Sequence, residues 1–133
     1  MAEENKSTMN LDENVASALA YVLTWVTGII FFFMEKENKT VRFHAMQSIL
    51  TFLPLTIIGW ALGWLGAPSV SYGGVGMYGT GVNYNPGIPA LMWLSWLVYL
   101  VMVVLWLVLM FKAYQGEKFK VPIVGDIAEN QIK

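Results

Sequence analysis

Polar side chains gather at the start of one long apolar segment of this chain. His44, Gln47, Ser48 and Thr51 stand at positions i, i+3, i+4 and i+7, which places them on one stripe of a helix. Such a stripe could cap the helix and meet lipid headgroups. It could instead form a buried hydrogen-bond network with a neighbouring helix, or face a vestibule or a bound peptide. The spacing alone leaves these three alternatives open.

Two charged residues complete this group, which we call the polar patch. Arg42 can pair with Glu35, with Glu37 or with a lipid phosphate. The residues of the patch are the functional candidates. We expect them to contact a polypeptide, another subunit or lipid headgroups. The polar patch consists of Glu35, Arg42, His44, Gln47 and Ser48.

The residue types argue against several kinds of chemistry. His44 is the only histidine and there is no cysteine, so a metal site is not expected. No serine or threonine has a histidine and an acidic residue placed to form a catalytic triad with it. We expect neither an enzymatic activity nor a cofactor. The net charge is −1, which provides no basic surface for nucleic acid.

The elements that must position these residues are set by a long uncharged stretch. Between Phe43 and Phe111 the chain contains no Lys, Arg, Asp or Glu. Charged residues are 13% of the whole chain, against about 25% in a typical soluble domain. The sequence therefore predicts an integral membrane protein with the lipid bilayer as its main environment.

Three apolar segments are long enough to cross a bilayer, which takes about 20 helical residues. All must be helices, because an isolated strand cannot satisfy its backbone groups in lipid. We therefore predict an all-α membrane domain over the whole chain. The predicted spans cover residues 15–34, 45–66 and 90–111, with an outer loop at 67–89 and tails at 1–14 and 112–133.

Small residues at four-residue spacing predict close helix packing, either within the chain or between copies in a homo-oligomer. Pro54 falls inside the second span and predicts a kink there, which could be a packing feature, a hinge or an opening to a cavity. The predicted packing residues are Ala16, Ala20, Thr24 and Gly28 in the first span and Gly59 and Gly63 in the second.

Basic residues predict the orientation, since they stay on the cytoplasmic side. With three crossings they place the N-terminus outside and the C-terminus in the cytoplasm of a multi-pass protein of the cell (plasma or inner) membrane. The basic residues are Lys36, Lys39 and Arg42 after the first span and Lys112, Lys118, Lys120 and Lys133 after the third.

The two segments outside the spans differ in composition. The glycine- and tyrosine-rich outer loop predicts a mobile connector whose tyrosines rest on headgroups, or a docking loop for a partner or substrate. The C-terminal tail mixes apolar residues with lysines, which predicts a bent interfacial segment or a disordered tail.

Two motifs resemble a family of small prokaryotic membrane proteins of unknown function. That family is distantly similar to the twenty-kilodalton component of the chloroplast inner-envelope import translocon. The resemblance implies a helical membrane protein that belongs to a protein-conducting or protein-inserting assembly, although the chloroplast component has four spans. The motifs fall on Glu35, Val41, Arg42, Phe43, His44, Ala45, Gln47 and Ser48, and on Gly116, Pro122, Gly125, Asp126, Ala128 and Glu129.

Three functions remain open at this point. The leading interpretation is a component of a protein-translocation or membrane-insertion assembly, which acts through other membrane proteins, a polypeptide substrate or self-assembly. The alternatives are an oligomeric channel or small transporter, and a membrane-anchored scaffold. The polar residues reach only about halfway along the second span, to Thr56, which favours an assembly role over an ion path.

Overall fold

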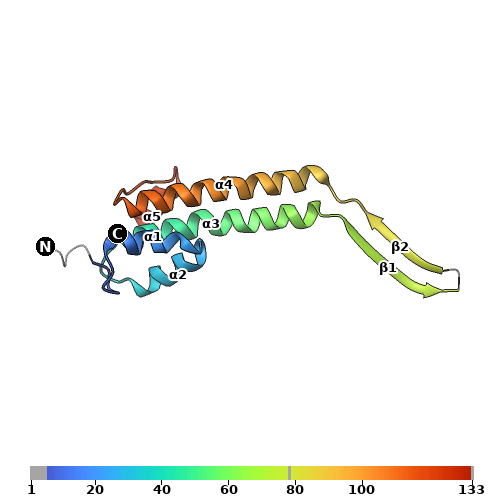
Figure 1. Cartoon of the computed structure of the whole chain (residues 1–133), viewed down its shortest axis with the longest axis horizontal. Helices are drawn as coiled ribbons and strands as arrows, with labels where there is room; N and C mark the ends of the chain where they lie inside the picture. The colour runs from blue at the N-terminus through green and yellow to red at the C-terminus, as the bar shows by residue number, and fades with distance from the viewer. Residues whose placement is uncertain (1–5, 78, 133) are drawn as a thin grey trace. The chain divides into compact units, whose positions relative to one another are not determined.

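The computed structural model describes residues 6–77 and 79–132 (Figure 1). It divides into two units. The first unit contains the chain up to Leu55 and from Val101 onward, and the second unit contains Thr56 to Leu100. The elements are α1 (Glu13–Val22), α2 (Trp25–Met34), α3 (Lys39–Gly66), β1 (Ser69–Gly76), β2 (Gly79–Asn85), α4 (Pro89–Tyr114) and α5 (Val124–Gln131).

Two helices, α3 and α4, are long and apolar enough to cross a membrane. Only 22% of the most apolar stretch of α3 and 11% of that of α4 are buried within the protein. A core helix of a soluble protein would bury most of that surface. The second and third predicted spans are therefore present as helices, and both extend beyond the predicted bounds.

The first predicted span is not one helix, and this prediction was wrong. Residues 15–34 form α1 and α2, which are separated at Leu23 and Thr24 and pack against each other as a helical hairpin (Figure 1). Each helix has 10 residues, about 15 Å of rise, whereas the hydrocarbon layer is roughly 30 Å thick. Neither helix can cross alone.

Local hydrogen bonds explain why the helix can break here. Thr24 has a φ of 56°, a conformation outside any helix. The Thr27 hydroxyl accepts a bond from the Leu23 amide at 3.1 Å and lies 3.2 Å from the Ala20 carbonyl. Ser48 of α3 donates to the Thr24 carbonyl at 2.7 Å. Side chains thus pair backbone groups that the break releases, as membrane helices require.

The predicted all-α fold was also wrong, because the outer loop contains two strands. Within residues 67–89, β1 and β2 form a two-stranded antiparallel sheet, with a register irregularity between Tyr72 and Val75. The base of this β-hairpin is fixed by a hydrogen bond from the Ile88 amide to the Gly66 carbonyl at 3.2 Å. Residue 78 of the predicted loop lies outside the described residues.

The C-terminal tail packs within the first unit. It leaves α4 through Gly116, whose φ of 80° suits a helix end. It then runs without regular structure to α5, where Ala128 and Ile132 pack with Phe43 of α3. The tail is therefore a docked segment rather than a disordered one, and its predicted place at the membrane interface stays a prediction.

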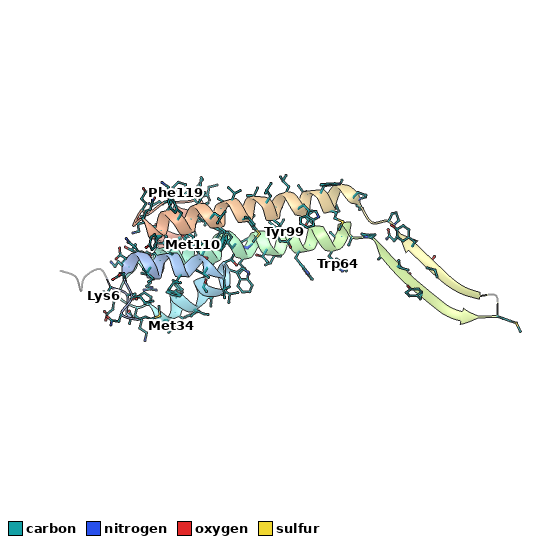
Figure 2. The ribbon with its side chains drawn as sticks, in the orientation of Figure 1. Lys6, Met34, Trp64, Tyr99, Met110 and Phe119 are labelled. Atoms are coloured by element: carbon teal, nitrogen blue, oxygen red, sulfur yellow. The ribbon has the colours of Figure 1, made fainter. Side chains whose placement is uncertain are left out.

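The predicted packing glycines lie at contacts within the chain. A Cβ on Gly28 would come within 2.9 Å of the Ala45 carbonyl oxygen, so α2 packs closely on α3. A Cβ on Gly59 would lie 3.1 Å from the Tyr99 ring, and Figure 2 shows Tyr99 between α3 and α4. Gly63 faces Ser95 in the same way. Of the two open alternatives, packing within one chain therefore applies to these glycines.

The remaining packing residues share no continuous stripe, because the break separates α1 from α2. Ala16 and Ala20 are fully buried on α1, whereas Thr24 forms the break itself. Pro54 lies inside α3, which continues through it. The boundary between the two units follows one residue later, at Leu55. The predicted kink at Pro54 stays a prediction.

Candidate functional site: a buried polar network

Three side chains of the first unit meet around the hydroxyl of Tyr21. This oxygen lies 3.0 Å from His44 Nδ1 and accepts a hydrogen bond from Gln47 Nε2, also at 3.0 Å. The three side chains are buried. The Tyr21 hydroxyl donates to His44 Nδ1 when the imidazole carries its proton on Nε2, and accepts from Nδ1 in the other tautomer. We call this group the Tyr21 network.

Gln47 extends the network to the C-terminal tail. Its Nε2 donates to the Phe119 carbonyl at 3.0 Å, and its Oε1 accepts from the Val121 amide at 3.1 Å. The side-chain amide thus donates one hydrogen bond to the backbone of the tail and accepts one from it, as the backbone of a neighbouring β-strand would. These two bonds tie residues 119–121 to α3.

Tyr21 also joins α4 to the network through its backbone. Trp106 Nε1 donates to the Tyr21 carbonyl at 2.8 Å. The rings of Phe52 and Tyr21 meet edge to face, with centroids 6.4 Å apart, and Leu109 and Ala113 complete the buried cluster. The network is therefore enclosed by apolar side chains from α1, α3 and α4.

Glu35 performs a separate task at the end of α2. Its buried carboxylate accepts hydrogen bonds from the amide of Thr8 at 2.7 Å and from the Thr8 hydroxyl. The amides of Asn38 and Glu37 add bonds at 3.0 and 3.2 Å. Burial raises the pKa of Glu35, but these hydrogen bonds outweigh it and hold the pKa below its usual value. The ionised side chain of Glu35 therefore holds the segment before α1 in place.

Asn38 links this arrangement to the start of α3. Its Oδ1 accepts from the Val41 amide at 3.1 Å, which is an N-cap bond, and its Nδ2 donates to Glu13 at 2.8 Å. Arg42 lies elsewhere, with its guanidinium 5.0 Å from the centre of the Phe32 ring. The structure thus divides the polar patch. His44 and Gln47 join the Tyr21 network, and Ser48 bonds to the backbone at the Thr24 break. Glu35 and Arg42 take part in neither group of contacts.

This arrangement matches the buried-network alternative for the polar patch. The polar groups of Glu35, His44, Gln47 and Ser48 bond to neighbouring elements of the same chain, whereas the buried Nε of Arg42 has no hydrogen-bond partner among the described residues. Within residues 6–77 and 79–132 no cluster of three or more His, Cys, Asp or Glu could hold a metal ion. Buried and paired groups of this kind stabilise and specify a fold. They offer no nucleophile or base beside open space.

The sequence interpretation missed the residues that complete these contacts. Tyr21 was hidden in an apolar run, although a hydroxyl in such a run needs a polar partner. Asn38 stands directly before α3, which is the usual N-cap position. Thr8 gave no signal, because its role depends on a contact with Glu35 that is distant in sequence.

Comparison with known proteins decides the family. A family model described as the magnetosome magnetite crystal formation protein family matches residues 7–128. The chain belongs to this family. A UPF0132 membrane protein of Methanocaldococcus jannaschii is 41% identical over 93% of this chain and 92% of its own length. A UPF0132 membrane protein of Archaeoglobus fulgidus is 43% identical over 92% of this chain and 97% of its own length. No solved structure matches this chain.

Membership in this family confirms part of the sequence interpretation. The archaeal relatives are named membrane proteins, as was predicted for this chain, and the expected family of small membrane proteins of unknown function is confirmed at that level. The more distant likeness to a chloroplast import component finds no support among these matches and stays a prediction.

Proposed function

We propose that this chain is a non-enzymatic structural subunit of a membrane assembly, which acts by binding other membrane proteins or further copies of itself. One observation carries the proposal. The polar side chains of Glu35, His44, Gln47 and Ser48 are paired inside the first unit, whereas large apolar side chains on α3 and α4 stay exposed. This contrast supports a role through contact surfaces rather than through a reaction site.

Two other functions were considered. A conducting path needs polar groups that face a continuous opening, but Ser48 donates to the Thr24 carbonyl and Ser95 to the Gly59 carbonyl. This pairing argues against a channel within one copy. Translocation or insertion of polypeptides would be one task of such an assembly, and a scaffold for soluble proteins another. We keep both as forms of the proposed role.

The family's description names magnetite crystal formation, which raises the question of a mineral surface. Carboxylate groups are the ligands that suit hard metal ions best. The β-hairpin, residues 69–85, contains no Asp, Glu, His or Cys. We therefore propose the assembly role without a mineral-binding step for this chain.

We further propose that the chain crosses the cell membrane twice, through α3 and α4. The α1–α2 hairpin would then enter and leave on one side. Lys36 and Lys39 precede or begin α3, and Lys112 ends α4, so the positive-inside rule assigns both ends to the cytoplasm. This arrangement revises the predicted outside N-terminus, because two crossings return the chain to its starting side.

Single cysteines test this topology, since the chain has none of its own. We expect Lys6→Cys, Glu37→Cys and Lys118→Cys to resist an impermeant maleimide in intact cells, and Ser71→Cys to react. Permeabilised cells provide the control, in which all four should react. Labelling of Lys6→Cys in intact cells together with protection of Glu37→Cys would restore three crossings.

Photo-crosslinking tests the assembly role. A photoreactive residue at the exposed position Leu97 of α4 should capture membrane proteins in living cells, which mass spectrometry then identifies. Position Ser95, buried on the same helix, is the matched control and should capture nothing beyond its own chain. A chain that runs as a monomer in mild detergent and gives lipid adducts only would contradict the proposal.

A further inference from the structure

A hydrogen bond fixes where the turn of the α1–α2 hairpin lies along α3. Ser48 donates to the Thr24 carbonyl at 2.7 Å, and a Cβ on Gly28 would come within 2.9 Å of the Ala45 carbonyl oxygen. Ser48 follows Lys39, the first residue of α3, by nine residues, which is about 14 Å of helical rise. The turn therefore lies beside the interior of α3 and not at its lysine-bearing end (Figure 1).

A second hydrogen bond gives a similar level on α4. Trp106 Nε1 donates to the Tyr21 carbonyl at 2.8 Å, and Trp106 precedes Lys112 by six residues, which is about 9 Å of rise. The hydrocarbon of one leaflet is about 15 Å deep. With α3 and α4 crossing the membrane as proposed above, on which this inference rests, the turn lies at the depth of the acyl chains of the cytoplasmic leaflet.

The backbone groups at the turn are paired within the protein. The Leu23 amide donates to the Thr27 hydroxyl at 3.1 Å. The Thr24 amide donates to the Tyr21 carbonyl at 2.9 Å, and the Val26 amide to the Leu23 carbonyl at 3.2 Å. A turn in water can leave such groups to the solvent, whereas lipid offers them no partner. This pairing is what a turn inside a bilayer requires.

The side chains at the turn are apolar and stay exposed. The exposed fractions are 39% for Val22, 60% for Leu23 and 39% for Val26. Turns in water are dominated by Gly, Pro, Asn, Asp and Ser, and residues 22–26 contain none of these five. The composition of the turn therefore suits an apolar surrounding.

The charged groups of the hairpin gather at its other end. Residues 14–34 contain no Lys, Arg, Asp or Glu. Glu13, which begins α1, accepts a hydrogen bond from Asn38 Nδ2 at 2.8 Å, and Glu35, which follows α2, accepts one from the Asn38 amide at 3.0 Å. Both ends of the hairpin thus meet directly before α3. The change from charged base to apolar turn follows the change from headgroups to acyl chains within one leaflet.

We infer that the α1–α2 hairpin is a re-entrant element whose turn, residues 22–26, contacts the acyl chains of the cytoplasmic leaflet. Each of its helices has 10 residues, and the resulting rise of about 15 Å matches one leaflet and not the whole hydrocarbon layer. The hairpin enters from the cytoplasmic side, turns at mid-membrane and returns. Lipid is therefore the partner of the exposed side chains at its turn.

Spin labels test the depth of the turn. The full-length variants Leu23→Cys, Val104→Cys and Glu37→Cys are labelled with a nitroxide in phosphatidylcholine and phosphatidylglycerol vesicles. Collisions with oxygen, which dissolves in lipid, are compared with collisions with a nickel chelate, which stays in water. Val104 is the matched control on α4, because it is 53% exposed and precedes Lys112 by eight residues, about 12 Å.

We expect positions 23 and 104 to behave alike. The ratio of oxygen to nickel collisions at both should exceed the ratio at position 37 by at least about tenfold, because the hydrocarbon layer contains no water. Frequent nickel collisions at position 23 alone would place the turn in water and overturn the inference. Few collisions of either kind at position 23 would mean that protein covers the turn, which would also overturn it.

These outcomes are distinguishable from failure of the proposed topology. Either result at position 23 alone would leave the two crossings of α3 and α4 standing. Frequent nickel collisions at both positions 23 and 104 would remove the crossings together with the inference.

A straight helix across the membrane would also keep position 23 in lipid, so the two ends of the hairpin need their own measurement. The Lys36 amide donates to the Thr8 hydroxyl at 3.3 Å, and Asn38 Nδ2 donates to the Lys6 carbonyl at 3.4 Å. A short bis-maleimide should therefore join Lys6→Cys to Lys36→Cys within one chain, which the mass of the linked peptides detects. Lys6→Cys combined with Leu23→Cys is the control and should stay unlinked. No link between positions 6 and 36, with both cysteines open to a monofunctional maleimide, would overturn the inference.

Discussion

The two hairpins of this chain differ in what holds them. The α1–α2 hairpin breaks in an apolar run, and side chains of Thr27 and Ser48 pair the backbone groups at the break. The β1–β2 hairpin depends on its own ladder and leaves a Tyr/Val face open. The first is part of the folded core. The second is an exposed surface, and the difference separates residues that stabilise the folded core from residues whose side chains stay exposed.

The Tyr21 network gives the strongest test of that difference. Gln47→Ala removes the side-chain partner of the Phe119 carbonyl and of the Val121 amide, and one of the two partners of the Tyr21 hydroxyl. We expect a loss of about 2–4 kcal/mol in the free energy of unfolding, measured in detergent, and protease cleavage of the released tail. Gln115→Ala, at an exposed position, is the control and should change stability by less than about 0.5 kcal/mol. Equal stability of the two variants would show that the network is not a structural core.

Glycine substitutions compare the two hairpins directly. Gly28→Ala forces a methyl group to within 2.9 Å of the Ala45 carbonyl oxygen, and we expect it to cost about 1–3 kcal/mol. Gly74→Ala meets open space and should leave unfolding unchanged. Thermal unfolding of both variants checks this contrast. The comparison fails if Gly74→Ala is the more destabilising substitution.

The sequence was sufficient to predict much of the scaffold. Hydropathy located the helices α3 and α4, because a span of about 20 apolar residues is a strong signal. The i, i+3, i+4 spacing predicted that His44, Gln47 and Ser48 share one helical stripe, and the structure buries all three side chains. It did not decide among their three roles, since that depended on Tyr21 and on residues 119–121, which lie far away in sequence.

Two features could not be read from the same patterns. The break at Thr24 carries no proline or glycine, and hydropathy averages over it. The β-hairpin was predicted as a loop because glycine is depleted in strands. Its two faces emerge only when the register pairs Val70 with Tyr84 and Tyr72 with Val82. Backbone pairing, rather than composition, was the missing information.

Glu35 tests the first unit through pH. Its folded-state pKa lies below the ordinary value of 4.5, so its carboxylate stabilises the fold above that pH, and this contribution is lost as pH falls through the lowered pKa. Glu35→Gln should cost about 1 kcal/mol at pH 7 and progressively less below pH 4.5. Unfolding of both proteins from pH 7 to pH 3 measures the gap. The control Glu37→Gln, at an exposed position, should show no such convergence. A gap that persists at low pH would mean that shape, not charge, holds Thr8.

Ser95 marks the smallest expected effect and tests whether the second unit has any polar core of its own. Its buried hydroxyl donates to the Gly59 carbonyl at 2.7 Å and faces Gly63. Hydrogen bonds between membrane helices average about 0.6 kcal/mol, so Ser95→Ala should cost about that much. Ser71→Ala on the exposed hairpin is the control and should cost nothing measurable in unfolding. Because the α3–α4 contact also has the close packing of Gly59 on Tyr99, it should survive the loss of this bond. A cost as large as that of Gln47→Ala would mean that both units depend on buried polar pairing, and the contrast between them would then lie in the β-hairpin alone.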